Sequence, residues 1–287
     1  MIEFIYYKEV VFLKKFEGML FCTDLDGTLF DSNKAVSKEN LDAIEYFKSE
    51  GGLFTFVTGR EPSTTGEIYS LVKPNAPFGC LNGAGIYDMP NNRYTFSMKL
   101  PQDFIELVRC VDKEMPDMGI QLNTEKHIYF NKDNAAMVFF RKITGVPNLY
   151  CHYNDVKEAV LKVVFAHMEP AQIEALERLL KSHPLAENFD FIRSELRLFE
   201  ILPKGASKGF LLEKLAEQLG IERHKTVAVG DYNNDVSMIK AAGIGFAVDN
   251  AVPEAKAVAD YITVSNNDSA IAVIIEGLDK GIFSCDK

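Results

Sequence analysis

Short, almost continuously apolar runs recur in the first and last thirds of the chain, bounded by glycine, aspartate or asparagine. The runs occupy residues 19–22, 53–57, 77–81, 226–230, 244–248 and 260–264. Apolar residues on both faces of a strand are typical of parallel sheets that helices cover on both sides. The pattern therefore predicts a parallel sheet at the centre of the fold.

Helical periodicity separates the predicted strands. We expect helices over residues 37–51, 207–220 and 233–243. Ser37 and Ser207 are suitable N-caps, and a glycine closes each of the three segments. Alternating strands and helices predict a doubly wound, Rossmann-like α/β fold.

The middle third of the chain has a different pattern. Pro90, Asn91 and Asn92 predict a hairpin turn. Helical stretches and strand-like stretches follow at residues 102–114, 120–130, 160–168, 170–182 and 189–202. Because strands and helices do not alternate regularly there, we expect an inserted α+β domain over residues 85–199. Residues 1–84 and 200–287 would then form the α/β core.

The composition is that of an ordinary globular protein, with 47% apolar and 25% charged residues in a chain of 287. The net charge is −10, and lysine and arginine form no block, so we expect no nucleic-acid partner. The five cysteines lie far apart without a CxxC pair, which argues against a disulfide framework and a structural zinc site.

No apolar run approaches the roughly 18 residues that span a membrane, and the start lacks the order of a signal peptide. The sequence therefore predicts a cytoplasmic protein without a membrane partner, as a monomer or homodimer.

Polar side chains follow the predicted strands, where open α/β sheets place their ligand sites. The candidates are Asp24, Asp26, Gly27, Thr28, Thr58, Gly59, Arg60, Asp231, Asn234 and Asp235, together with Lys208 at the start of a helix. Each of these residues alone is more often part of a turn or a helix cap. Their common position at strand and helix ends favours one shared site.

Four carboxylates that face one crevice repel each other, and a hard divalent cation relieves the repulsion. Mg²⁺ prefers oxygen ligands, and no His/Cys cluster suggests zinc. Asp231 is the first candidate ligand, with Asp235 as a second or outer one. Together with a lysine and a threonine, Mg²⁺ indicates phosphate as the bound anion.

Asp24 is the candidate nucleophile, because an aspartate carboxylate can form an aspartyl-phosphate. Asp26, two residues on, is the candidate general acid and base: it protonates the leaving alcohol and then activates water. Gly27 allows the sharp turn that presents both side chains.

Other residues are candidates for holding the phosphate. Thr58 and Lys208 are expected to hold the nonbridging oxygens, with Gly59 beside them. Asn234 is placed either for the metal shell or for the phosphate. Arg60 contacts substrate or pairs with a surface carboxylate, and the sequence leaves both possibilities open.

The segments "DLDGTL", "VTGR", "KGASKG" and "GDYNND" resemble the four motifs of the haloacid dehalogenase-like (HAD) hydrolase superfamily, and the insertion resembles the α/β cap of its Cof-type subfamily. The resemblance implies that Asp24 is the nucleophile, Asp26 the general acid/base and Lys208 the phosphate-binding lysine. It further implies that Asp24, the backbone carbonyl of Asp26 and Asp231 hold Mg²⁺, the expected cofactor. The cap would close over the site and select the substrate.

The chain departs from the family pattern in three places. Asp249 stands where members commonly have a glycine, and residues 268–270 read Asp-Ser-Ala in place of Asp-Gly-Val. Residues 1–18 precede the usual start, so we expect either an added edge element or a chain that starts at Met19.

These observations predict a Mg²⁺-dependent phosphatase that hydrolyses small phosphorylated metabolites, with sugar phosphates favoured, through an aspartyl-phosphate. One alternative is a phosphomutase or other phosphotransferase on phosphosugars, which uses the same aspartate pair. Another is a non-catalytic phosphosugar-binding regulator. Dehalogenation needs no second aspartate, so Asp26 weighs against it.

Overall fold

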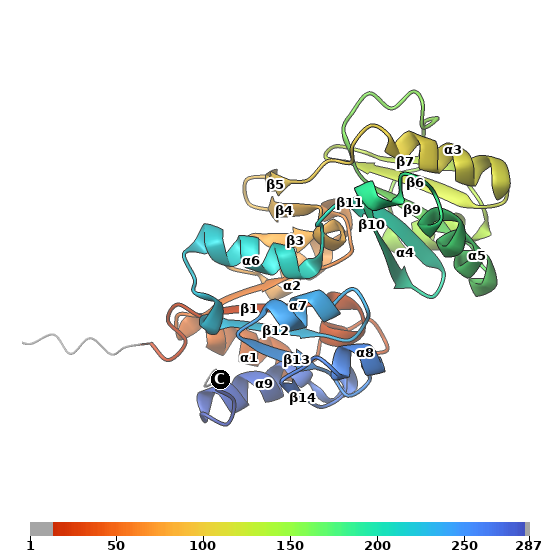
Figure 1. Cartoon of the computed structure of the whole chain (residues 1–287). Coiled ribbons are helices and arrows are strands. Elements are labelled where there is room, and N and C mark those ends of the chain that lie inside the picture. The colour runs from red at the N-terminus through yellow and green to blue at the C-terminus, as the bar shows by residue number, and fades with distance from the viewer. Residues whose placement is uncertain (1–13, 285–287) are drawn as a thin grey trace, which may run out of the picture.

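The computed structural model describes residues 14–284, which form a core and a cap (Figure 1). The core is built on a five-stranded parallel sheet of order β14-β13-β12-β1-β2. Its strands are β1 (Leu20–Thr23), β2 (Leu53–Phe56), β12 (Thr226–Gly230), β13 (Ile244–Ala247) and β14 (Tyr261–Ile262). The predicted α/β fold with a central parallel sheet is confirmed.

Different helices cover the two faces of this sheet (Figure 1). They are α1 (Lys38–Ser49) and α9 (Ala270–Asp279) on one face, and α6 (Lys208–Leu219) and α7 (Val236–Ala241) on the other. Along β1, Phe21 packs on the face that α1 and α9 cover, whereas Leu20 and Cys22 pack on the face that α6 and α7 cover. Successive residues of the strand are thus buried on opposite faces, which explains its continuous apolar run.

The predicted helix ends agree with the structure in most cases. Ser37 caps α1, and Ser207 caps α6, each by accepting a hydrogen bond from the backbone N–H three residues on. Gly220 closes α6 in the left-handed conformation at φ 67°. The third helix ends at Ala241, ahead of Gly243.

The predicted hairpin forms, but it belongs to a sheet next to the core. Three antiparallel strands in the order β3-β4-β5 make up this sheet: β3 (Phe78–Cys80), β4 (Gly85–Asp88) and β5 (Arg93–Ser97). A parallel bridge between Val57 and Gly79 links it to the core sheet. Tyr87 and Tyr94 pack into the apolar cluster of the core. We therefore propose cap limits near residues 99 and 204 in place of 85 and 199.

The cap is a six-stranded sheet of order β10-β11-β9-β6-β7-β8 with three helices. Its elements are α3 (Phe104–Glu114), β6 (Gly119–Thr124), β7 (Ile128–Lys132), α4 (Ala135–Thr144), β8 (Leu149–Tyr150), β9 (Val160–Ala166), α5 (Pro170–Lys181), β10 (Phe189–Glu195) and β11 (Leu198–Pro203). Helices α3 and α5 cover one face of the sheet. Helix α4 packs on part of the opposite face. The alternating positions Gln121, Asn123, Lys162 and Glu200 contribute polar side chains that contact one another or the core.

Several elements have no counterpart in the sequence prediction: α2 (Gly66–Val72), α4, α8 (Pro253–Lys256), α9 and β8. The expectation for the N-terminal extension falls largely on residues 1–13, which lie outside the described part. Within that part, Cys22, Cys80, Cys110 and Cys151 are free thiols. None of the helices over residues 14–284 has the length and hydropathy required to cross a membrane.

Candidate active site

The end of β1 places Asp24 at the carboxyl edge of the core sheet, and the chain then turns tightly through Leu25–Leu29. Asp24 is 6% exposed. Gly27 has a φ of +81°, and a Cβ at this position would lie 2.5 Å from Oδ2 of Asp231. Glycine is therefore required both for the turn and for the approach of Asp231, as the sequence predicts for the turn.

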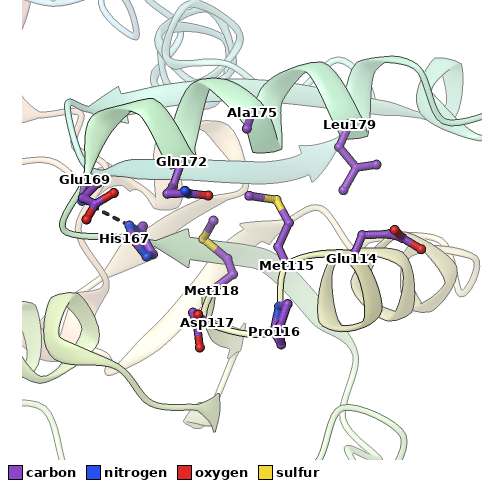
Figure 2. A pocket seen from close by; sticks show the side chains of 10 residues that line it. All are labelled: Glu114, Met115, Pro116, Asp117, Met118, His167, Glu169, Gln172, Ala175 and Leu179. Carbon is purple, nitrogen blue, oxygen red and sulfur yellow. Dashed lines mark hydrogen bonds between the residues drawn. The ribbon is translucent and has the colours of Figure 1, made fainter.

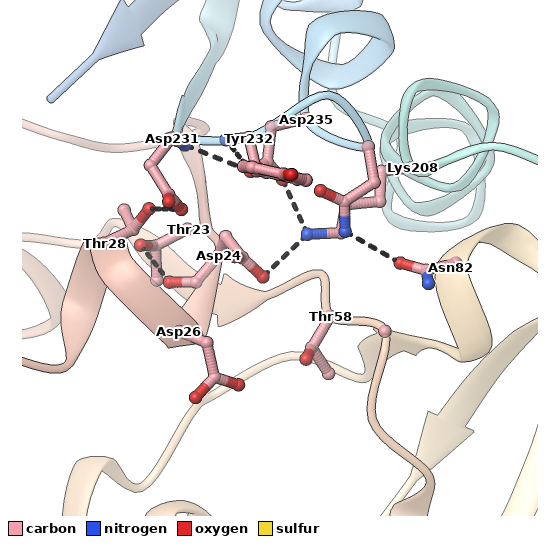
Figure 3. A network of polar contacts seen from close by, with 12 residues as sticks. Thr23, Asp24, Asp26, Thr28, Thr58, Asn82, Lys208, Asp231, Tyr232 and Asp235 are labelled. Carbon is pink, nitrogen blue, oxygen red and sulfur yellow. Dashed lines mark hydrogen bonds and ion pairs between the residues drawn. The ribbon is translucent and has the colours of Figure 1, made fainter. Parts of the chain in front are cut away.

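Lys208, the first residue of α6, joins two of the acids (Figure 3). Its Nζ lies 2.7 Å from Oδ1 of Asp24 and 2.6 Å from Oδ1 of Asp235. Burial by itself lowers the pKa of Lys208, but Asp235 and Asp24 outweigh it and raise that pKa above its usual value. The lysine therefore stays charged although only 1% of it is exposed.

The loop after β12 carries Asp231 and Asp235. Oδ2 of Asp235 accepts hydrogen bonds from the backbone N–H groups of Asp231 and Tyr232, both at 3.0 Å. The hydroxyl of Thr28 donates to Oδ1 of Asp231 at 2.9 Å. Both oxygens of Asp235 are thus engaged within the protein, whereas Oδ2 of Asp231 accepts no hydrogen bond from residues 14–284.

The acids around Asp24 form a group that fits a hard divalent cation. One oxygen from each of Asp24, Asp231 and Asp235 lies within 4.8 Å of the other two. Burial and then the charge of Asp235 raise the pKa of Asp231 to about 7, and the same two causes raise the pKa of Asp24 well above its usual value. Such mutual repulsion is what a bound cation relieves, and oxygen-only donors suit Mg²⁺.

Asp26 lies in a different electrostatic environment, and its side chain points away from the acid group (Figure 3). Arg60 donates to it twice, from Nε to Oδ2 and from Nη2 to Oδ1, both at 2.8 Å. Lys34 adds a third contact at 2.8 Å. Burial raises the pKa of Asp26, but Arg60 and then Lys34 outweigh it and lower that pKa to about 2. The sequence left the partner of Arg60 open, and the structure pairs it with Asp26.

The predicted phosphate-binding residues lie on the loop after β2 and beside it. Thr58 is buried, and its hydroxyl oxygen accepts from the backbone N–H of Arg60 at 3.2 Å. The hydroxyl hydrogen is then free to donate to an anion. Asn234 is also buried, and its Nδ2 donates to Oδ1 of Asn82 at 3.0 Å.

Asn82 is a site residue that the sequence prediction missed, because the segment "NGAG" has the pattern of an ordinary glycine-containing turn. It is fully buried and has a φ of 54°. The strand-end rule that found Asp24 also applies to Asn82, which directly follows the run at 77–81.

The cap contacts the core beside the loop after β2, which carries Thr58 and Gly59. Nζ of Lys162 donates to the Gly59 carbonyl at 2.9 Å. Gln121 and Asn123 both donate to Oε1 of Glu61, at 3.1 and 2.6 Å. These bonds hold the polar face of the cap sheet against the loop that carries Thr58.

A separate hollow of about 570 Å³ lies on the outer side of the cap, between the end of α3 and α5 (Figure 2). Met115 and Met118 line it, and His167 accepts from the backbone N–H of Glu169. No predicted site residue lines this hollow.

Comparisons with known proteins give one family and one fold. The haloacid dehalogenase-like hydrolase model matches residues 21–275. "Putative phosphatase YxeH" of Bacillus subtilis is 30% identical over 275 residues, covering 90% of this chain and 97% of YxeH. The 5-amino-6-(5-phospho-D-ribitylamino)uracil phosphatase YitU of Bacillus subtilis is 24% identical, covering 88% and 94%. The solved structure of the HAD subclass IIB sugar phosphatase BT4131 has a TM-score of 0.80 at 20% identity, covering 92% of this chain and 100% of that one; it supports the fold alone.

The family match spans every residue of the predicted site, from Asp24 to Asp235. YxeH extends this match over nearly the full length of both chains. The chain therefore belongs to the haloacid dehalogenase-like hydrolases and is a phosphatase of that family.

Proposed function

We propose that the protein is a Mg²⁺-dependent phosphatase that hydrolyses small phosphorylated metabolites, with sugar phosphates favoured, through an aspartyl-phosphate intermediate. The observation that carries this proposal is the placement of Asp24, which directly follows β1. Its carboxylate contacts Nζ of Lys208 and lies close to the carboxylates of Asp231 and Asp235. A carboxylate in this position can attack phosphorus while preorganised charges stabilise the transferring group.

Asp24 and Asp231 would hold the cation, with the backbone carbonyl of Asp26 as the further ligand that the resemblance implies. We place Asp235 outside the coordination sphere, because Lys208 and two backbone N–H groups already occupy its oxygens. When bound, Mg²⁺ neutralises charge on the phosphoryl oxygens.

Two donors are available for the phosphoryl oxygens. Lys208 has three N–H hydrogens, and contacts with Asp24 and Asp235 use two of them. Thr58 offers its hydroxyl hydrogen from the neighbouring strand end. Together they would orient the phosphorus toward Asp24.

Asp26 is assigned the proton transfers. Held ionised by Arg60, it is ready for the second step, in which it takes a proton from the attacking water. The first step needs a protonated carboxyl on Asp26. Arg60 therefore has to release Asp26 and bind the substrate instead when the phosphate arrives. This exchange gives Arg60 a substrate-binding role.

Two features support a polyhydroxylated leaving group. The cap presents the polar side chains Gln121 and Asn123 beside the phosphate-binding loop, and these can exchange hydrogen bonds with hydroxyl groups. The relative YitU acts on a phosphoribityl compound by its name.

The nucleophile is tested with Asp24→Asn, assayed on an aryl phosphate with Mg²⁺. We expect a loss of about 10⁴-fold in kcat, because the amide cannot form the acyl phosphate. Asp42→Asn, at an exposed position of α1, is the matched control and should keep full activity. An active Asp24→Asn protein would contradict the proposed nucleophile.

The intermediate is tested by acid quench during turnover, followed by borohydride reduction and peptide mass spectrometry. Reduction of an acyl phosphate converts the aspartate to homoserine, so we expect homoserine at position 24 and nowhere else. Incubation with a sugar bisphosphate separates the alternative: release of inorganic phosphate supports the phosphatase, whereas an isomerised sugar phosphate indicates a phosphomutase.

A further inference from the structure

Side chains from two loops late in the chain hold the backbone that follows Asp26. Nδ2 of Asn250, in the loop after β13, donates to the Gly27 carbonyl at 2.8 Å. Nδ2 of Asn266, in the loop after β14, donates to the Phe30 carbonyl at 2.8 Å. The two bonds join positions that are 223 and 236 residues apart, so the rest of the core has to bring them together.

A third asparagine extends these contacts toward Lys34. Oδ1 of Asn267, also in the loop after β14, accepts from the backbone N–H of Ser32 at 2.9 Å. Lys34 follows two residues later, and its Nζ lies 2.8 Å from Oδ1 of Asp26. The three amides, which we call the asparagine clamp, are those of Asn250, Asn266 and Asn267.

The amide of Asn250 is engaged at both ends. Its Oδ1 accepts from the backbone N–H of Asn266 at 2.9 Å. A backbone N–H only donates, so the NH₂ group of Asn250 has to face the Gly27 carbonyl. The clamp therefore joins the two loops to each other as well as to the turn after Asp24.

The turn needs such support because it contains the most mobile kind of residue. Asp26 and Gly27 both depart from helical backbone angles, with a ψ of 117° at Asp26 and a φ of 81° at Gly27. Glycine adopts more backbone conformations than any other residue. The peptide group that follows Gly27 can therefore rotate unless its carbonyl is held, and such a rotation would move the neighbouring Asp26.

The bond between Asn250 and Gly27 affects position more than stability. Asn250 is an exposed residue, and its contact with Gly27 is open to solvent. Water can therefore replace the lost hydrogen bond when the amide is removed. The Gly27 carbonyl then stays satisfied, but its direction is no longer fixed.

We propose that the asparagine clamp is a set of positioning residues for proton transfer by Asp26. As the bond from Asp24 to phosphorus forms, the bond from phosphorus to the leaving oxygen breaks, and the proton of Asp26 passes to that oxygen. The clamp holds the backbone next to Asp26 so that its carboxyl meets the leaving oxygen. This inference rests on the acid/base role of Asp26 in the proposed function.

The test compares two aryl phosphates of similar shape, 4-nitrophenyl phosphate and phenyl phosphate, at saturating Mg²⁺. Nitrophenolate leaves without a proton, whereas the more basic phenolate gains from a general acid. Asn250→Ala should therefore lower kcat/KM about 10-fold more for phenyl phosphate than for 4-nitrophenyl phosphate. A looser fold or weaker cation binding slows both substrates alike, so the ratio of the two kcat/KM values reports proton transfer.

Asn75→Ala is the matched control, because Asn75 has the same bonding pattern away from the site. It is exposed, its Nδ2 donates to the Gly52 carbonyl at 3.0 Å, and its Oδ1 accepts from the Phe54 N–H at 2.8 Å. The ratio of the two kcat/KM values should stay at the wild-type value. Equal ratios in Asn250→Ala and Asn75→Ala overturn the clamp.

Asp26→Asn separates the clamp from the proposed function. It keeps the side-chain shape but has no acidic proton, so it should show the largest selective loss with phenyl phosphate. Equal losses with both substrates in Asp26→Asn overturn the acid role of Asp26, and the clamp with it. A selective loss in Asp26→Asn without one in Asn250→Ala overturns the clamp alone.

Asn267→Ala replaces Asn250→Ala if the latter does not fold. Asn267 is exposed as well, and its bond to Ser32 lies farther from Asp26. We expect a selective loss with phenyl phosphate in the same direction and of smaller size. A wild-type ratio in this variant then overturns the proposal.

Discussion

Asp24 and Asp26 are separated by one residue, yet the protein gives their carboxylates opposite electrostatic surroundings. Burial and neighbouring acids raise the pKa of Asp24, whereas Arg60 and Lys34 overcome burial and lower that of Asp26 to about 2. Two carboxyl groups whose pKa values are pushed apart can take different roles in one reaction. Extended backbone at Asp24 and the turn after it direct the two side chains to different partners.

Arg60→Met should raise the pKa of Asp26, because the guanidinium that stabilises the ionised form is lost. Without Arg60, half-protonation of Asp26 moves upward from about pH 2 toward the usual value. The measurement is a ¹³C NMR titration of the Asp26 carboxyl, with Asp26→Asn to assign the signal.

Lys34→Met is the control for this titration. The Lys34 side chain is 63% exposed, compared with 26% for Arg60, so water screens its charge more strongly. A smaller upward shift is expected. An unchanged Asp26 pKa in Arg60→Met would show that the pair does not control the acid.

At the scale of the elements, the start of helix α6 carries both a cap that stabilises the helix and a residue of the candidate site. Ser207 caps the helix by accepting from the Phe210 N–H at 3.1 Å, and the next residue is Lys208. The cap and the positive helix end therefore fix the position from which the lysine side chain starts.

Ser207→Ala should lower the free energy of unfolding by about 1 kcal/mol and raise KM for the aryl phosphate. The first effect follows from the lost cap, and the second from looser placement of Lys208. Urea denaturation and steady-state kinetics measure them.

Ser37→Ala removes the corresponding cap of α1, where Ser37 accepts from Asn40 at 3.2 Å. It should cost similar stability without changing KM, because α1 carries no site residue. Equal KM values in the two variants would contradict a link between the α6 cap and phosphate binding.

At the scale of the whole molecule, the acid group links stability to pH and, if it binds the proposed cation, to Mg²⁺. The pKa of Asp231 is raised to about 7 from an ordinary value of 3.8, and that of Asp24 is raised as well. Between pH 4 and 7 the folded protein therefore binds more protons than the unfolded chain. Stability must fall as pH rises through this window.

Asp24 and Asp231 should therefore make the melting temperature of the metal-free protein decrease as the pH rises from 4 to 7. Mg²⁺ at 100 times its dissociation constant should add about 2.7 kcal/mol to the free energy of unfolding at pH 7. Thermal melts across pH with MgCl₂ or EDTA test both statements.

Asp231→Asn is the comparison for these melts. It should flatten the decrease and weaken the Mg²⁺ effect, because it removes one repelling charge and one of the proposed cation ligands. A melting temperature that is independent of Mg²⁺ at pH 7 would contradict the proposed metal site.

The sequence by itself determined the core strands, the capped helices and the polar residues at the strand ends. These features are local, since apolar runs, caps and turn glycines act over a few residues. The order of the motifs was enough to indicate Asp24, Asp26, Lys208 and Asp231. Their assigned catalytic and metal-binding roles remain predictions.

Tertiary structure decided what depends on contacts between distant segments. Arg60 pairs with Asp26 across 34 positions, and Asn82 meets Glu200 across 118, so no local pattern could reveal either contact. The hairpin after β3 joined the core because its tyrosines pack there, although its sequence pattern suits either domain.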